Sequence, residues 1–222
     1  MKIKDITRFL EDQAPLKLQE SYDNAGLILG DKDAEVSAAL VTLDVTEAIV
    51  DEAINRKAGL IIAHHPIVFS GLKKITGKNY IERTLIKAIK NDVAIYAAHT
   101  NLDSVTNGVN GKICEKLGLE NCKILQPSSG MLKKLVTYVP VDHAEKVREA
   151  IFASGAGNIG NYDSCSFNVH GQGTFRGSET ANPFVGEKGE QHYENEIRLE
   201  TVFPSYLQGK TINALLQAHP YD

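Results

Sequence analysis

Two short apolar runs, each ending in histidine, constrain how this chain can fold. Leu60-Ile61-Ile62-Ala63 leads directly into His64-His65-Pro66, and about thirty residues later the run over residues 93–98 leads into His99. Unbroken apolar runs of this length are typical of strands that are buried on both faces of a sheet. Where such strands are parallel, their carboxyl ends meet at one edge, and ligands bind there. The two runs therefore predict a single site at the ends of neighbouring strands.

Helical segments alternate with apolar strands through the first part of the chain. We expect strands over residues 27–29, 38–43, 60–63 and 93–98, and helices over residues 4–14, 47–56, 80–90 and 108–117. Thr46 is a suitable N-cap for the second of these helices, and Gly118 is a suitable end for the last. This alternation favours an α/β fold built on a mainly parallel, layered sheet whose strands are buried on both faces.

The pattern changes near residues 125–131. Beyond them the expected order is a strand (134–139), a helix (144–153), two strands (163–170 and 194–203) and a final helix (211–218). This is the order of an α+β ferredoxin-like unit without its last strand. We therefore divide the chain into residues 1–130, which carry the histidine pair, and residues 131–222. The connection over residues 171–189 is of a length that is often functional or mobile.

Charge and cysteine content narrow the class of protein. The formal net charge of −4 comes from interspersed acidic and basic residues, so bulk nucleic-acid binding is not expected. No apolar run approaches the length that spans a bilayer, and the first residues lack the apolar core of a secretion signal. The chain has three cysteines, Cys114, Cys122 and Cys165, and none forms a C-x-x-C motif. An odd count without this spacing argues against a disulfide framework and against a zinc ribbon. The expected setting is the reducing cytoplasm, with no membrane association.

The histidines are in positions that suit a metal. Neighbouring residues in a strand point to opposite faces, so His64 and His65 can share a site only where the strand has ended, which Pro66 favours. Asp103 follows His99 by four residues, and a turn there can place Asp103 as a ligand with His99 beside it. Imidazole and carboxylate are suitable ligands for zinc, iron, manganese, cobalt or nickel. The alternative is that each histidine is a hydrogen-bonded core residue, but two clusters at equivalent strand ends favour metal.

Two further motifs have less certain meaning: the first has two open interpretations, and the second is rejected as a nucleotide-binding motif. Tyr22-Asp23-Asn24 is either a simple turn or places Asp23 or Asn24 at the same edge of the sheet, where it orients a ligand histidine or a substrate. Residues 155–160 match G-x-G-x-x-G by letter, but they follow a helix and precede a strand. A dinucleotide fingerprint has the opposite context, so a tight glycine connection is the better interpretation.

With these residues in view, the chain resembles the Nif-three-like family, the GTP cyclohydrolase I type 2 homologues. The resemblance lies in Tyr22-Asp23-Asn24-Ala25-Gly26, in Ala63-His64-His65-Pro66 with Phe69, and in His99-Thr100-Asn101-Leu102-Asp103. It implies a site for two divalent metals in which His64, His65 and Asp103 are ligands. The family's later His-x-x-x-Glu ligand pair has no counterpart here, so we expect this chain to lack the family's C-terminal half.

The residues from 133 onward resemble the CutA/PII-like domain that long members of the family carry as an insertion. The matching stretches are Thr137-Tyr138-Val139-Pro140, residues 155–162, Gly173-Thr174-Phe175-Arg176, Asn182-Pro183-Phe184 with Gly186, and His219-Pro220-Tyr221. The resemblance also implies ring-shaped homo-oligomers, with a hexamer as the expected state.

Two classes of function follow. The first is a metal-dependent hydrolase of the GTP cyclohydrolase kind, in which a metal-bound hydroxide attacks a nucleotide or another substrate and Asp23 or His99 shuttles the proton. The second is a non-catalytic, ring-forming regulatory or interaction protein with a sensor-like inserted domain. Release of formate from GTP, dependent on metal, distinguishes the first class from the second.

Overall fold

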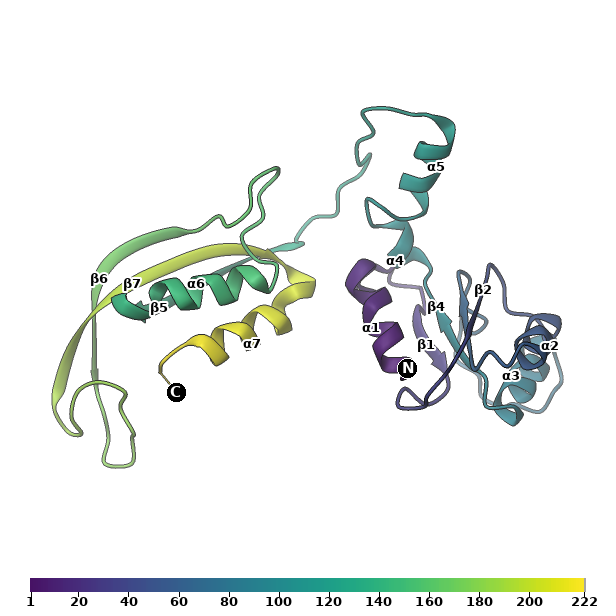
Figure 1. Cartoon of the computed structure of the whole chain (residues 1–222), viewed down its shortest axis with the longest axis horizontal. Coiled ribbons are helices and arrows are strands. Elements are labelled where there is room, and N and C mark those ends of the chain that lie inside the picture. The colour runs from purple at the N-terminus through teal and green to yellow at the C-terminus, as the bar shows by residue number, and fades with distance from the viewer. Residues whose placement is uncertain (222) are drawn as a thin grey trace. The chain divides into compact units, whose positions relative to one another are not determined.

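The computed structural model describes residues 1–221 of the chain (Figure 1). They form two compact units that meet between Leu125 and Gln126. This division lies close to the boundary expected after residue 130.

The first unit contains the predicted α/β sheet. Its elements are α1 (Ile3–Gln13), η1 (Leu16–Leu18), β1 (Gly26–Leu29), β2 (Ala39–Thr42), α2 (Glu47–Asn55), β3 (Leu60–Ala63), α3 (Tyr80–Lys90), β4 (Ala94–Ala97), α4 (Thr100–Asp103) and α5 (Val109–Leu117). The strand order is β1-β4-β3-β2. β2, β3 and β4 run parallel, and β1 is antiparallel to β4. The expectation of a mainly parallel sheet is confirmed, and β3 and β4, which deliver the histidines, are adjacent.

Local sequence signals set the ends of the helices. The Thr46 side chain accepts a hydrogen bond from the Ile49 amide at 3.3 Å and caps α2, as predicted. Asn79 caps α3 in the same way through the Glu82 amide at 2.9 Å. Gly118 ends α5 with a positive φ of 68°, a conformation that glycine adopts without a steric penalty.

The two central strands form the core of this unit. Ile61 and Ile95 are fully buried against α2 and α3, while Leu60 and Tyr96 are buried with Ile3 of α1 on the opposite face. The expectation that all strands are buried on both faces is wrong for β2, whose Val41 is 75% exposed. The reason is that β2 pairs with β3 alone among the described residues and lies at the edge of the sheet.

The second unit is an antiparallel sheet with two helices. Its elements are β5 (Leu132–Pro140), η2 (Val141–His143), α6 (Ala144–Ala153), β6 (Phe167–Arg176), β7 (Gln191–Pro204), η3 (Ser205–Leu207) and α7 (Gln208–Ala218). The chain follows the predicted order of strand, helix, strand, strand, helix, and the sheet has the order β5-β7-β6. Ile197 and Leu199 of β7 pack with Val147 and Ile151 of α6 in the core.

The two middle strands of this unit differ from the prediction. β6 begins at Phe167 and continues to Arg176, and β7 begins at Gln191, so the connection is shorter than the expected loop over residues 171–189. The ladder continues because Gly171 and Gly173 pair regularly with β7. In sequence the glycines indicate a loop, but their backbone amides and carbonyls pair in a ladder like those of any other residue. Among residues 1–221, no helix is long and apolar enough to cross a membrane.

Candidate metal centre

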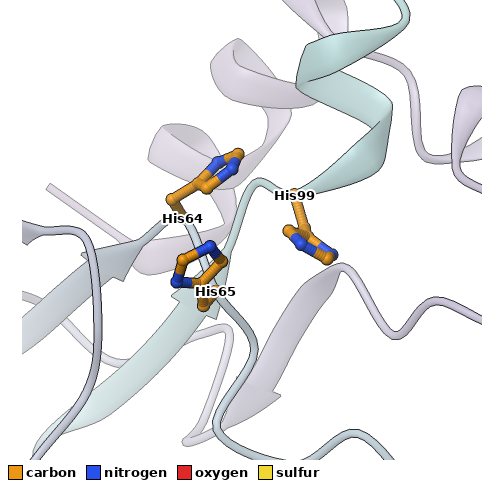
Figure 2. Close-up of side chains that lie close together, drawn as sticks. All are labelled: His64, His65 and His99. Carbon is orange, nitrogen blue, oxygen red and sulfur yellow. The ribbon is translucent and has the colours of Figure 1, made fainter. Parts of the chain in front are cut away.

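Three histidine rings meet at the carboxyl ends of β3 and β4 (Figure 2). β3 ends at Ala63, and the chain stays beside β2 through hydrogen bonds from the His64 amide to Thr42 O (3.2 Å) and from the His65 amide to Leu43 O (2.9 Å). Because the strand has ended, the two neighbouring side chains are not held on opposite faces of the sheet. Their ring centroids are 4.9 Å apart.

His99 comes from the end of β4 and joins this pair. Its ring centroid lies 5.2 Å from that of His64 and 5.5 Å from that of His65. One ring nitrogen of each histidine lies within 4.8 Å of the others, a separation that allows a metal ion to bind between them. The prediction that the two strand ends form one site is therefore confirmed in geometry.

Each of the three rings has its Nδ1 atom fixed by an acceptor. The His64 Nδ1 lies 2.9 Å from the backbone carbonyl of Ala98. The His65 Nδ1 lies 2.8 Å from a carboxylate oxygen of Asp44, and the His99 Nδ1 lies 2.8 Å from a carboxylate oxygen of Asp23. Carbonyl and carboxylate oxygens only accept hydrogen bonds, so each Nδ1 carries the hydrogen and donates it.

This arrangement fixes the tautomer of every ring. With its hydrogen on Nδ1, a neutral imidazole has a free lone pair on Nε2, the form that binds metal. A hydrogen bond from the other nitrogen to a carboxylate or a backbone carbonyl is the usual partner of a metal-binding histidine, since it orients the ring and increases its basicity. The residues present therefore fit a divalent metal such as zinc, iron, cobalt or nickel.

Asp23 is the most enclosed acceptor of the site. Its side chain has no exposed surface, and it accepts hydrogen bonds from the Thr100 amide (3.0 Å), the Thr100 hydroxyl and the Asn24 amide (2.7 Å) as well as from His99. Burial alone would raise the pKa of the Asp23 carboxyl, but these hydrogen bonds together lower it below its usual value. Asp23 therefore stays ionised and keeps His99 in one orientation.

Comparison with known proteins places the chain in a family. Residues 1–196 match the family described as Duf34/NIF3 (NGG1p interacting factor 3). The chain belongs to this family. NIF3 relatives named GTP cyclohydrolase 1 type 2 homolog include one from Bacillus subtilis strain 168, 42% identical over 220 residues (99% of this chain), and one from Halalkalibacterium halodurans, 41% identical over 218 residues (98%). The chain spans 59% of the length of both relatives.

Solved structures of similar proteins have the same fold. A Bacillus cereus protein related to NIF3 matches with a TM-score of 0.84 at 43% identity, over 100% of this chain and 59% of its own. The Staphylococcus aureus protein SA1388 matches with a TM-score of 0.65 at 31% identity, over 100% of this chain and 57% of its own. The family resemblance inferred from the sequence motifs is thus confirmed.

The structure arranges the other predicted NIF3 site residues in part as expected. Asp23 lies at the same edge of the sheet and contacts His99. Asp103 is the last residue of α4 and lies half-buried one turn after His99. It does not belong to the group of three histidines whose ring nitrogens lie within 4.8 Å of one another. His99 is in that group instead.

The role of Asp44 was missed at the sequence level, and so was the contact between Tyr22 and Phe69. Asp44 directly follows β2 at the edge where the histidines gather, and this position was the signal for its role. Phe69 packs edge-on against His99 at 5.7 Å and stacks with Tyr22 at 6.4 Å, and both aromatic rings are largely exposed. Only the tertiary fold brings Tyr22 next to Phe69.

Proposed function

We propose that this chain forms a divalent-metal centre of a metal-dependent hydrolase, as the name of the GTP cyclohydrolase 1 type 2 homologs suggests. The observation that carries the proposal is the fixed tautomer of the three histidines, each with Nδ1 bound to an acceptor. Histidine rings that are oriented in this way through Nδ1, with one ring nitrogen of each within 4.8 Å of the others, are typical of a metal centre.

His64 and His65 hold the metal, and Asp103 is proposed as a further ligand. The family resemblance implies this set, together with two divalent metals in the full site. Such a metal supplies Lewis acidity, which activates water for hydrolysis at neutral pH. The exposed rings of Tyr22 and Phe69 provide an apolar border on which a substrate such as a purine base can stack.

His99 and Asp23 are proposed as the proton shuttle. A carboxylate that binds the Nδ1 hydrogen of a histidine stabilises the imidazolium that forms when Nε2 accepts a proton. Here the carboxylate is fully buried and ionised, while the His99 ring is 15% exposed, so a proton can reach Nε2 from the site. Asp23 acts through His99 and does not itself contact the substrate.

His99 has an alternative role as a third metal ligand. A ring nitrogen of His99 lies within 4.8 Å of those of His64 and His65, which is close enough to bind the same metal. Zinc content and release of formate from GTP, measured for His65→Ala and His99→Ala, separate the two roles. A proton shuttle predicts that His99→Ala retains zinc and loses turnover, whereas a third ligand predicts that both are lost. Unchanged zinc content in His65→Ala contradicts the metal centre itself.

A regulatory, ring-forming protein is the second candidate. It is favoured by two exposed apolar side chains, Val41 of β2 and Leu43 just after it, which are 75% and 59% exposed, because uncovered apolar surface is typical of protein–protein contacts. The order β5-β7-β6 also supports a ferredoxin-like, CutA/PII-like second unit. We propose a cytoplasmic homo-oligomer, with the hexamer as the state to test by light scattering. A hexamer without formate release, with metal present, supports the regulatory function.

A further inference from the structure

The second unit contains a buried carboxylate that lacks a cation. Ile197 and Leu199 of β7 face the helices, so the alternating residues Glu196, Arg198 and Glu200 lie on the opposite face of the sheet. Glu200 is bound by Lys134 and Arg198. Glu196 is only 8% exposed, yet it belongs to no ion pair formed among residues 1–221. A largely buried carboxylate that no cation balances is costly, so Glu196 in this position favours a cation from outside the chain.

Glycines in β6 make the space for this carboxylate. Gly171 pairs with Glu196 across the ladder, and Gly173 is the next residue on the same face. A Cβ atom built on Gly173 would lie 2.2 Å from a Glu196 carboxylate oxygen. The Glu196 carboxylate therefore occupies the space that a side chain at position 173 would fill. Glu194, which pairs with Gly173, lies 2.8 Å from the His192 Nε2, whereas Glu196 pairs with no cationic side chain among residues 1–221.

Aromatic rings surround the same place. Tyr221 lies 6.1 Å from Phe175 and 6.2 Å from Phe184, measured between ring centroids. His219 holds the segment after α7 in position by a hydrogen bond to the Tyr138 carbonyl at 2.8 Å. The Tyr221 hydroxyl is buried beside the Glu196 carboxylate. Burial, then a hydrogen bond to Glu196, and then the charges of Glu196 and Glu194 raise the pKa of Tyr221, so its hydroxyl is neutral.

We propose that Glu196, Tyr221, Phe175 and Phe184 bind an organic cation, either an ammonium or a guanidinium group. The carboxylate supplies the opposite charge, and the faces of aromatic rings attract cations. The Tyr221 hydroxyl provides an oxygen that accepts a hydrogen bond from an N–H group. Apolar rings around a single carboxylate suit a weakly hydrated organic cation better than a metal ion, which requires several oxygen or nitrogen ligands.

This site is independent of the histidine cluster and of the function proposed for it. It joins three stretches that the metal chemistry leaves unexplained: Gly173-Thr174-Phe175-Arg176, Asn182-Pro183-Phe184 and His219-Pro220-Tyr221. The last stretch is distant in sequence from the first two, but the contacts of Phe175, Phe184 and Tyr221 bring one residue of each together.

Calorimetric titration of the metal-free 222-residue chain tests the proposal. Agmatine, which carries both an ammonium and a guanidinium group, and tetramethylammonium are the probes, with sodium chloride and 1-butanol as matched charge and shape controls. We expect saturable binding of at least one organic cation and none of either control. Binding of butanol equal to that of the cations, or no binding of either cation at millimolar concentration, overturns the proposal.

Variants show whether Glu196 carries the binding. Glu196→Gln is expected to weaken binding at least tenfold. Phe184 is 53% exposed in a loop, and Phe184→Ala is expected to weaken binding about fivefold. Glu187→Gln removes an exposed charge from the same loop and should bind like the wild type. Equal affinity of Glu196→Gln and Glu187→Gln for the cation contradicts the site.

Thermal unfolding separates a ligand role from a structural one. Without a cation, Glu196→Gln should unfold at a higher temperature than the wild type, because the unpaired buried charge is gone. Addition of the cation should raise the unfolding temperature of the wild type alone. If Glu196→Gln is less stable and the cation stabilises both proteins equally, Glu196 is a structural residue and the proposal fails.

The source of the cation is determined by a last comparison. A short peptide with one lysine that binds more tightly than butylammonium identifies the side chain of a partner protein as the ligand. Weaker binding of the peptide identifies a free amine. Both results uphold the cation site, and both must be lost in Glu196→Gln.

Discussion

Removal of the Asp44 carboxylate tests how the metal centre is built. Asp44 accepts the Nδ1 hydrogen of His65 at 2.8 Å. Loss of such an outer partner typically lowers metal affinity about 10- to 100-fold. The Asp44 side chain is 61% exposed, so water can replace it as the acceptor. We therefore expect the lower end of this range for Asp44→Ala, a loss of about tenfold or about 1.4 kcal/mol.

Zinc titration against a competing chelator dye measures this loss. Asp12→Ala is the matched control, because Asp12 is an exposed acid on α1 and its removal changes the net charge equally. His65→Ala should cost more than Asp44→Ala, since it removes the ligand itself.

A double-mutant cycle makes the test specific. Asp44 acts only through His65, so Asp44→Ala should have no further effect once His65 is alanine. Wild-type zinc affinity in Asp44→Ala refutes the reasoning. An equal loss in the wild-type and His65→Ala backgrounds also refutes it, because Asp44 would then act by general electrostatics.

Two further predictions concern stability. Asp23→Asn should destabilise the first unit by about 1–3 kcal/mol in urea unfolding, because an amide cannot accept all the hydrogen bonds now donated by Thr100, Asn24 and His99; an unchanged unfolding curve contradicts this. Glu82 accepts hydrogen bonds from the Thr76 and Lys78 amides, and these bonds lower the pKa of its carboxyl from the ordinary value of 4.5. The ionised carboxyl therefore stabilises the folded state above pH 4.5, and this stabilisation is lost as the pH falls through the lowered pKa. The protection of these two amides, measured as hydrogen exchange relative to the intrinsic rate at the same pH, should therefore fall in acid in the wild type, whereas Glu82→Gln should show low protection at neutral pH and little further change in acid.

The central strands and the meeting of the histidines could be predicted from the sequence. Leu60–Ala63 and the run before His99 are too apolar for anything but buried strands, and parallel pairing then brings their carboxyl ends together. Thr46 and Gly118 likewise determined helix ends through local chemistry alone.

Other features depend on tertiary contacts that a local pattern does not contain. The direction of β1 is not encoded in four apolar residues, and the exposure of Val41 depends on what neighbours β2. Asp44 gains its role only because β2 and β3 end side by side. The glycines of β6 favour a loop locally, yet the long ladder with β7 includes them.

Nitrogen NMR of the histidine rings tests the central claim most directly. Long-range ¹H–¹⁵N spectra of the metal-free chain, with signals assigned through His64→Gln and His65→Gln, report which ring nitrogen carries the hydrogen. We predict hydrogen on Nδ1 of both His64 and His65 and, on addition of zinc, a shift of both Nε2 signals to the metal-bound position. Hydrogen on Nε2 in the metal-free chain, or spectra that zinc leaves unchanged, would contradict the account.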